Sequence, residues 1–243
     1  MPRRRPFDPG IPPEILPPDF AVRHDLHNYL YFRPTFGLTP AQPWAPLTDA
    51  EWEALRPFLA EHGCGVSDHP RAGRPMVDAR ARLDAIFRAV TLKAPLPRGG
   101  RGTWAQLPAE HGKADTVSRC YRRWARANLW ARLLTAVAHP ECPKVLGSLT
   151  YYICCAFRRA VRLMGLRAIV LARRLRLFSA LPAPSVLLPD HDLSESLWPV
   201  FPAIVNRMQE GGWRPDPRAI KGLIALHTLA AGRRRVSRWM EPA

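Results

Sequence analysis

The amino-acid sequence predicts an all-α protein. From Leu47 onward, apolar residues recur at the i, i+3, i+4 and i+7 spacing of amphipathic helices. Residues that favour helix N-caps stand before several of these stretches, and proline-rich or glycine-rich breaks separate them. Hydrophobic residues make up 47% of the 243 residues, which is enough to fill the core of one or two domains.

Residues 1–46 are predicted to form a Pro-rich N-terminal arm. They contain eleven prolines, which fix the backbone and remove amide donors, so an extended segment is favoured over a packed domain. The basic tip of the arm, Arg3 to Arg5, can follow a nucleic-acid groove or form a frayed end. Four large apolar residues of the arm are expected to lie against the rest of the protein or a partner. They are Leu30, Tyr31, Phe32 and Phe36.

Two amphipathic helices are predicted next. Thr48 and Glu51 form a capping box at the start of a helix over Asp49–Glu61. A second helix is predicted to open near Asp78, with one apolar face at helical spacing. That face consists of Leu83, Ile86, Phe87 and Val90.

The following stretch has the pattern of a helix-turn-helix. Thr103 can cap a short helix that ends at Gly112, and a second helix then covers Lys113–Ala127. At ~100° per residue, this second helix carries its apolar residues on one face and its arginines on the other. The apolar residues are Val117, Cys120, Tyr121 and Trp124, and the arginines are Arg119, Arg122, Arg123 and Arg126. Asn128 begins the last helix, so residues 47–138 form one predicted domain.

The basic balance of the chain indicates a polyanionic partner. Lys and Arg total 36 against 20 Asp and Glu, for a net charge of +16, and 32 of the 36 are arginine. Such an excess attracts nucleic acids or anionic membrane surfaces, although an arginine-rich composition also follows from a high-GC genome. The clustering on Lys113–Ala127 is the stronger indication, because this helix carries no acid after Asp115.

Five stretches of the predicted domain point to a known family. They read LTDAEWEALRPFL (Leu47–Leu59), GRP (Gly73–Pro75), RLDAIF (Arg82–Phe87), KAPL with TWAQLP (Lys93–Pro108) and TVSRCYRRWARANLWARLL (Thr116–Leu134). Together they resemble the N-terminal DNA-binding domain of bacterial insertion-sequence transposases of the DDE type, over about ninety residues in order. The chain departs from that family at Lys93, which stands in place of a glycine, and in an insert around Pro97–Gly102.

The resemblance implies a helical domain that binds transposon-end DNA through the helix with the four arginines. We assign phosphate contacts to Arg122 and Arg126, and base edges to Arg119, Arg123 or Ser118. The predicted partner is double-stranded DNA, and a second copy of the chain, giving a homodimer, is a further candidate. The predicted DNA contacts are Lys113, Thr116, Ser118, Arg119, Arg122, Arg123 and Arg126.

Residues 139–243 are predicted to form a basic helical extension. A long amphipathic segment over residues 148–180 can bend at Gly165, and it could contact DNA, a partner helix, a membrane surface or the protein core. Two shorter helices follow, at Pro199–Met208 and after the capping residue Asp216. The first is expected to turn Phe201, Ile204, Val205 and Met208 inward, and the second carries Ile220, Leu223, Ile224 and His227 on one face. The predicted secondary basic contacts are Arg158, Arg159, Arg162, Arg173, Arg174, Arg176, Arg233, Arg234 and Arg235.

No catalytic residue, metal site or cofactor is predicted. In the transposases that the chain resembles, a ribonuclease-H-like domain holds two metal ions with three carboxylates. Only 105 residues follow Ala138, and their acids do not stand at the ends of β-patterned runs. We therefore expect DNA binding without transposase catalysis and without a small-molecule substrate. Asp190, His191 and Asp192 are interpreted as a loop and helix cap instead of a metal cluster.

Two other functions stay open at this point. One is a metal-dependent transposase whose carboxylates are scattered over residues 139–243. The other is a helical interaction module that binds a protein partner or a membrane surface.

The cysteines and the first residues indicate a cytoplasmic protein, associated with the nucleoid through DNA. The cysteines are odd in number and irregularly spaced, which favours reduced thiols over a disulfide framework. The N-terminus lacks the apolar stretch of a signal peptide, and no uncharged run is longer than 15 residues, too few to span a bilayer. The cysteines are Cys64, Cys120, Cys142, Cys154 and Cys155.

Overall fold

The computed structural model describes residues 15, 38–66, 76, 78–94, 101–211 and 213–232. Within these residues the protein is all-α, as predicted, and the β-type pairing is confined to an isolated bridge between Lys93 and Arg101. None of the described helices is both long and apolar enough to cross a bilayer. Most of the predicted Pro-rich arm, including its basic tip and its four large apolar residues, lies outside the described residues.

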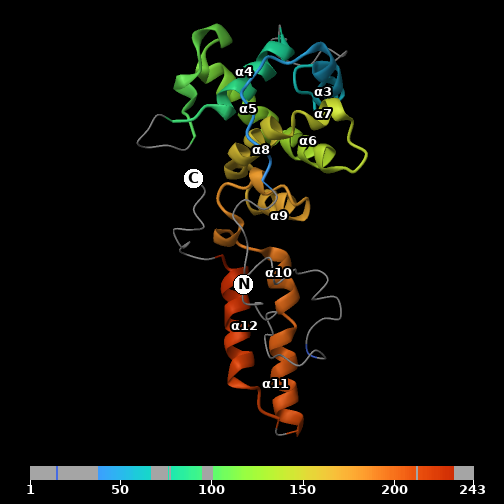
Figure 1. The fold of residues 1–243 in the computed structure, drawn as a ribbon, viewed down its shortest axis with the longest axis vertical. Helices are drawn as coiled ribbons and strands as arrows, with labels where there is room; N and C mark the ends of the chain where they lie inside the picture. Colours follow the sequence, from blue (N-terminus) through green and yellow to red (C-terminus); the bar gives the residue numbers. More distant parts are fainter. Residues whose placement is uncertain are drawn as a thin grey trace, which may run out of the picture. The chain divides into compact units, whose positions relative to one another are not determined.

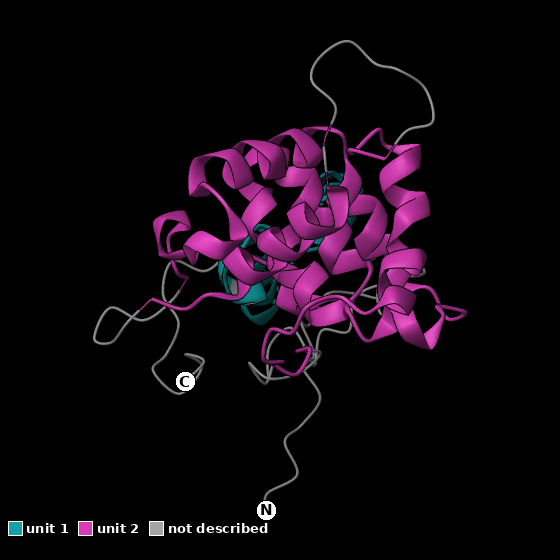
Figure 2. Ribbon diagram, turned by 90° about the horizontal axis from the view of Figure 1, so that it is seen from above, with its two compact units in different colours: residues 1–36, 183–243 teal, residues 37–182 magenta. Residues whose placement is uncertain are grey.

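The chain divides into two compact units (Figure 2). One unit consists of residues 37–182, and the other combines residues 1–36 with residues 183–243. The predicted domain bounds, after residues 46 and 138, differ from this division. The reason is that a helix from residues 139–182 packs closely with the helices that precede it.

Helix α8 (Thr150–Met164) forms the centre of the unit 37–182 (Figure 1). It packs against α4 (Ala79–Thr91), α5 (Ala114–Arg126) and α6 (Leu129–Ala138). Six consecutive residues of α8, Tyr152 to Phe157, are buried, so every face of that stretch meets protein. Three further helices belong to this unit: α3 (Asp49–Glu61), α7 (Lys144–Gly147) and α9 (Leu166–Arg174).

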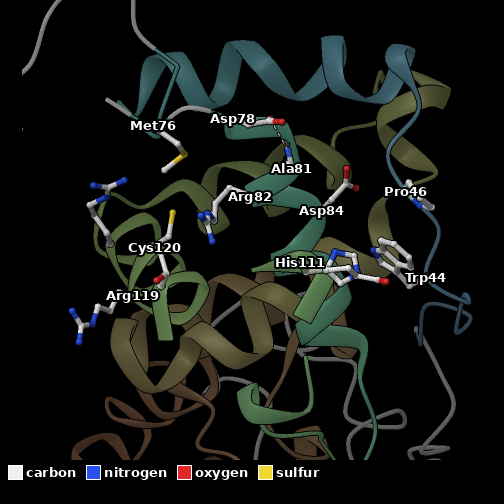
Figure 3. A pocket seen from close by; sticks show the side chains of 13 residues that line it. Trp44, Pro46, Met76, Asp78, Ala81, Arg82, Asp84, His111, Arg119 and Cys120 are labelled. Atoms are coloured by element: carbon white, nitrogen blue, oxygen red, sulfur yellow. Dashed lines mark hydrogen bonds and ion pairs between the residues drawn. The ribbon is translucent and has the colours of Figure 1, made fainter. Parts of the chain in front are cut away.

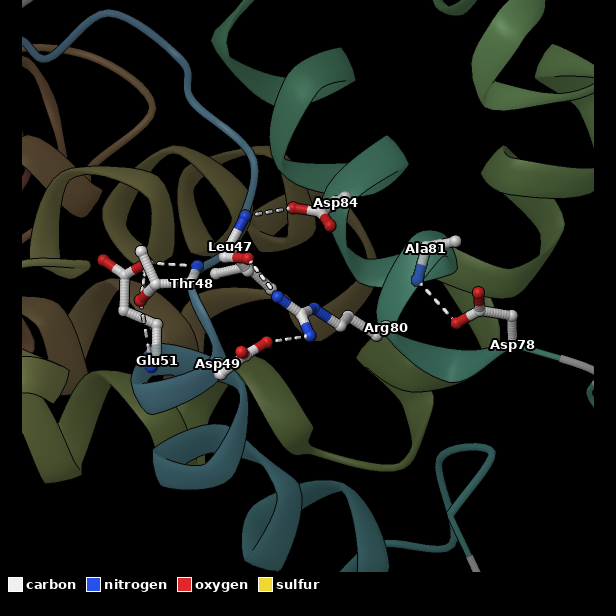
Figure 4. Close-up of polar contacts among 8 residues, drawn as sticks. All are labelled: Leu47, Thr48, Asp49, Glu51, Asp78, Arg80, Ala81 and Asp84. Atoms are coloured by element: carbon white, nitrogen blue, oxygen red, sulfur yellow. Dashed lines mark hydrogen bonds and ion pairs between the residues drawn. The ribbon is translucent and has the colours of Figure 1, made fainter.

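Capping residues start α3 and α4 where the sequence predicts (Figure 4). The Thr48 N–H donates to Glu51 Oε2 at 2.9 Å, and the Glu51 N–H donates to Thr48 Oγ1 at 3.3 Å, which completes the capping box of α3. The Asp78 carboxylate caps α4 by accepting from the Ala81 N–H at 2.8 Å. Both predicted N-termini are confirmed.

Side chains of α4 also hold the residue that precedes the α3 cap. The Leu47 N–H donates to Asp84 Oδ1 at 2.8 Å, and the Leu47 carbonyl accepts from Arg80 (Figure 4). Burial raises the pKa of Asp84, against the lowering effects of this hydrogen bond and of the Arg80 charge. Asp84 therefore binds its proton more tightly in the folded chain than in the unfolded chain. Its contribution to stability is fully present below the unfolded pKa of 3.8 and is lost as the pH rises through the folded pKa.

Asp84→Asn and Asp84→Ala separate the charge from the hydrogen bond. Asparagine keeps an acceptor for the Leu47 N–H and removes the titration, so we expect the free energy of unfolding at pH 7 to change by less than about 1 kcal/mol. The loss of stability above about pH 4 should also become shallower in this variant. Alanine leaves the Leu47 N–H unpaired, at an expected cost of about 1–3 kcal/mol. Urea unfolding at several pH values measures both effects, and equal losses in the two variants would contradict the prediction.

The predicted short helix after Thr103 is not an α-helix. The segment forms two 3₁₀ turns, Trp104–Gln106 and Ala109–His111. Pro108 between them has no N–H and disfavours a helical conformation at the preceding residue, Leu107, which is extended at φ −65° and ψ 126°. A continuous helix therefore cannot run through this segment.

The long segment predicted over residues 148–180 is divided at Gly165, where a bend was expected. Helix α8 ends and α9 begins at this residue, which has a φ of 72°. A positive φ of this size favours glycine over other residues, so Gly165 allows the chain to change direction between the two helices.

Three helices form the described core of the second unit (Figure 1): α10 (His191–Leu197), α11 (Val200–Gly211) and α12 (Pro217–Ala230). Asp216 caps α12 by accepting from the Arg218 N–H at 2.8 Å, as predicted. The core of this unit includes Leu193, Leu197, Val200, Ile204, Leu223 and Leu226, together with Ile15 from the N-terminal part.

The predicted orientation of α11 is only partly correct. Of its four expected inward residues, Ile204 is buried, whereas Phe201, Val205 and Met208 are exposed. Periodicity does not distinguish these residues, because all four are apolar and lie within one broad arc of the helix.

Candidate nucleic-acid interface

Helix α5 has a buried back that fixes its position. Val117, Tyr121 and Trp124 are buried, as the periodicity predicts. The Tyr121 ring stacks on Trp130 of α6 with a centroid distance of 5.5 Å, and its hydroxyl donates to the Ala156 carbonyl of α8 at 2.8 Å. Burial raises the pKa of Tyr121 far above its ordinary value, so the hydroxyl stays a donor. The helix is thus anchored to two others by stacking and by a buried hydrogen bond.

The front of α5 carries the four predicted arginines, Arg119, Arg122, Arg123 and Arg126, all exposed. We call this surface the arginine face. Within the described part of the chain, an ion pair joins Arg119 of this face to Asp115 at 2.8 Å, with both side chains largely exposed. A solvent-exposed pair of this kind is weak, so a phosphate can displace the carboxylate. Lys113 and Thr116 are also exposed, near the N-terminus of the helix.

Ser118 does not belong to this exposed surface. It is 3% exposed, its hydroxyl donates to the Asp115 carbonyl at 3.2 Å, and its Oγ accepts from Arg122 Nη2 at 3.2 Å. A predicted role in reading base edges does not fit this position. Ser118 instead orients the guanidinium of Arg122.

A hollow of about 800 Å³ lies beside the arginine face (Figure 3). Its lining comes from α4 and the residues just before it, from α5, from the 3₁₀ turn Ala109–His111 and from the segment before α3, and it includes Arg119 and Arg123. Arg82 reaches into it from α4, with a buried Nη1 that has no hydrogen-bond partner among the described residues. Asp78, Asp84 and Glu110 line the same hollow. The hollow therefore carries both signs of charge, whereas the arginine face carries mainly one.

The arginine face lies within a stretch that matches a known protein family. Residues 47–134 match the family model described as "Putative transposase of IS4/5 family". This region is transposase-related. It runs from the residue before the α3 cap into α6, and α8, which closes its core, lies beyond the match. No curated protein and no solved structure matches the chain.

Arg159 of α8 is tied to the backbone of the transposase-related region. Its Nη1 donates to the Ala89 carbonyl at 3.1 Å and its Nη2 to the Gly102 carbonyl at 3.2 Å. Its guanidinium carbon lies 4.2 Å from the centroid of the Trp104 ring. Burial lowers the pKa of Arg159. These contacts hold the end of α4 and the first 3₁₀ turn together, so the predicted DNA contact does not fit this residue.

The other predicted secondary contacts differ in exposure. Arg162, Arg174 and Arg176 are exposed, while Arg158 and Arg173 are half-buried. They stay predictions. Arg233, Arg234 and Arg235 lie outside the described residues.

Two basic residues of the transposase-related region were not singled out by the sequence. Arg82 was seen only as a flank of the α4 core stripe, and nothing in its spacing shows that it enters a hollow. Burial, and then the charges of Arg158 and Arg162 on α8, lower the pKa of Arg101. Its position follows a breaker-rich stretch whose path the sequence pattern does not define.

The acids considered for metal binding lie outside the transposase-related region. Asp190 is buried and caps α10 by accepting from the Leu193 N–H at 3.1 Å, so the helix-cap interpretation is confirmed. Among the described residues, His191, Asp192 and Glu195 offer ligand atoms within 4.8 Å of one another. His191 Nδ1 lies 3.4 Å from Glu195 Oε1. This group belongs to α10 and has no part in the arginine face.

Proposed function

We propose that the transposase-related region binds duplex DNA through the arginine face. The observation that carries this proposal is the orientation of α5: its back is fixed by Tyr121 and Trp124, and its four arginines are exposed, with Arg119 paired to Asp115. An α-helix fits the major groove, where arginine pairs with guanine edges and with phosphates. The two 3₁₀ turns and Gly112 before α5 would stand in place of the first helix of a helix-turn-helix.

Each residue of the arginine face has a proposed role. Arg122 and Arg126 bind phosphates, and Arg119 and Arg123 reach base edges once Arg119 leaves Asp115. Lys113 and Thr116 bind the sugar-phosphate backbone of the DNA near the positive N-terminal end of α5. The targets we propose are insertion-element ends, where the protein would compete with an active transposase, or a chromosomal site. The protein would bind DNA on the nucleoid and carry out no catalytic step.

The test is fluorescence anisotropy with labelled duplexes over a series of salt concentrations. About 6 phosphate contacts predict a slope of log K against log salt near −5 for the full chain. Changing Arg119, Arg122, Arg123 and Arg126 together to alanine should flatten the slope by roughly 3 and weaken binding about 100-fold at low salt.

A charge-matched variant controls for the loss of four cations. Arg56, Arg132, Arg167 and Arg214 are all exposed and lie outside α5, so changing them together to alanine removes the same charge. This control should keep a slope close to that of the parent, apart from a small long-range effect. If both quadruple variants lose affinity equally, binding depends on net charge and the proposed site is wrong.

A further inference from the structure

The second compact unit exposes a broad apolar stripe along α11 and α12. Phe201 and Ile224 are each 60% exposed, and Trp198, just before α11, is 79% exposed. Such side chains are rarely left in water together on a soluble protein. The stripe comprises Trp198, Phe201, Val205, Met208, Ile220 and Ile224, and we call it the α11–α12 stripe.

The two helices present this stripe on one side of the hairpin. The rings of Phe201 and His227 meet edge to face with centroids 6.4 Å apart, which joins the start of α11 to the end of α12. One turn forward along α11 leads from Phe201 to Val205, and one turn back along α12 leads from His227 to Ile224. A further turn in each direction leads to Met208 and Ile220. The exposed residues of the two antiparallel helices therefore form one continuous surface.

Among the described residues, the core of this unit leaves the stripe uncovered. On α11, Val200 and Ile204 face the core, and Phe201 and Val205 follow each of them by 100° around the helix. On α12, Ala219 and Leu223 face the core, and Ile220 and Ile224 follow them in the same way. Each helix thus has an apolar arc that extends beyond the side covered by the core of this unit. The second half of each arc needs another layer.

We infer that a second copy of this chain covers the α11–α12 stripe, and that the two hairpins form a four-helix bundle. The exposed fractions of the six residues correspond to roughly 600 Å² of apolar surface, and with the polar rim the patch approaches the ~800 Å² that each partner contributes to a stable interface. A hairpin face that packs on its own copy about a two-fold axis needs no other partner.

The experiment measures the mass of the full chain in solution at several protein concentrations, without DNA, by sedimentation equilibrium. The parent should approach twice its monomer mass of 27.4 kDa at concentrations above about 10 μM. Val205→Glu and Ile224→Glu place a charge in the centre of the stripe, and each should weaken dimerisation about 100-fold. Both positions are exposed, so the helical content measured by circular dichroism should not change.

Asn206→Glu is the matched control. Asn206 is exposed, and its change to glutamate adds the same charge to the same helix at a position 100° away from Val205. It should leave the dimer intact, and the parent dimer should persist in 1 M salt because its centre is apolar. A parent that stays monomeric at all concentrations would overturn the inference, as would a dimer that the control weakens as much as Val205→Glu. Flotation of a monomeric parent with phosphatidylserine-containing vesicles would assign the stripe to a membrane surface and overturn it too.

Discussion

Trp130→Ala is expected to lower the free energy of unfolding of the chain by about 4 kcal/mol. Trp130 is fully buried, and its ring packs with Phe87 of α4 and with Tyr121 and Trp124 of α5 at centroid distances of 6.4, 5.5 and 6.2 Å. Its indole N–H has no hydrogen-bond partner among the described residues, so the loss is one of packing and cavity formation. Urea unfolding monitored by far-ultraviolet circular dichroism measures this change.

Trp198→Ala provides the contrast for this variant. Trp198 is 79% exposed, and in dilute protein its removal should change the free energy of unfolding by no more than about 0.5 kcal/mol. Because the rings around Trp130 support the back of α5, Trp130→Ala should also lose DNA affinity at temperatures where Trp198→Ala retains it. A stable Trp130→Ala variant would show that the aromatic cluster does not hold α5 in place.

Arg159→Ala is expected to cost about 3 kcal/mol of stability, the second largest effect. The change leaves the carbonyls of Ala89 and Gly102 without their charged donor and removes the cation–π contact with Trp104. Arg159→Lys should recover only part of the loss, because an ammonium cannot present two parallel donors. The salt slope of DNA binding, measured where the variant is folded, should not change.

Arg162→Ala is expected to have the opposite effects on stability and on the salt slope of DNA binding. Arg162 is exposed on α8, and its charge acts unfavourably on the nearby Arg101. Its removal should leave thermal stability unchanged or slightly raised, while the salt slope falls by about 1 if Arg162 contacts a phosphate. A loss of stability in Arg162→Ala that equals that of Arg159→Ala would contradict the distinction between a bracing arginine and a surface arginine.

The elements of this fold that have local causes could be predicted from the sequence. Thr48, Asp78 and Asp216 cap α3, α4 and α12 because their side chains reach backbone N–H groups only two or three residues away. The two faces of α5 follow from helical periodicity in the same way. The position of Gly165 between α8 and α9 reflects a backbone conformation that favours glycine.

What depends on distant partners could not be predicted. Arg159 looked like other basic residues of its helix until the carbonyls of Ala89 and Gly102, far away in sequence, were brought to it. Ser118 lies between the two faces of α5, and its burial depends on neighbours that the periodicity does not identify. The prediction of a short α-helix after Thr103 was wrong for a local reason, because the effect of Pro108 on the preceding residue outweighs the capping signal.

The central position of α8 determines the shortest segment of this protein that can fold with the arginine face. A gene segment that encodes only residues 47–134 would carry the whole arginine face, yet it would lack the hydrogen-bond acceptor of Tyr121 and the helix that packs against α4, α5 and α6. In a fusion protein, such a segment would expose the apolar residues that α8 covers in the full chain, and chaperones and proteases would bind them. The compact unit that contains α8 is residues 37–182, so a gene rearrangement that reuses the arginine face must carry α8 with it.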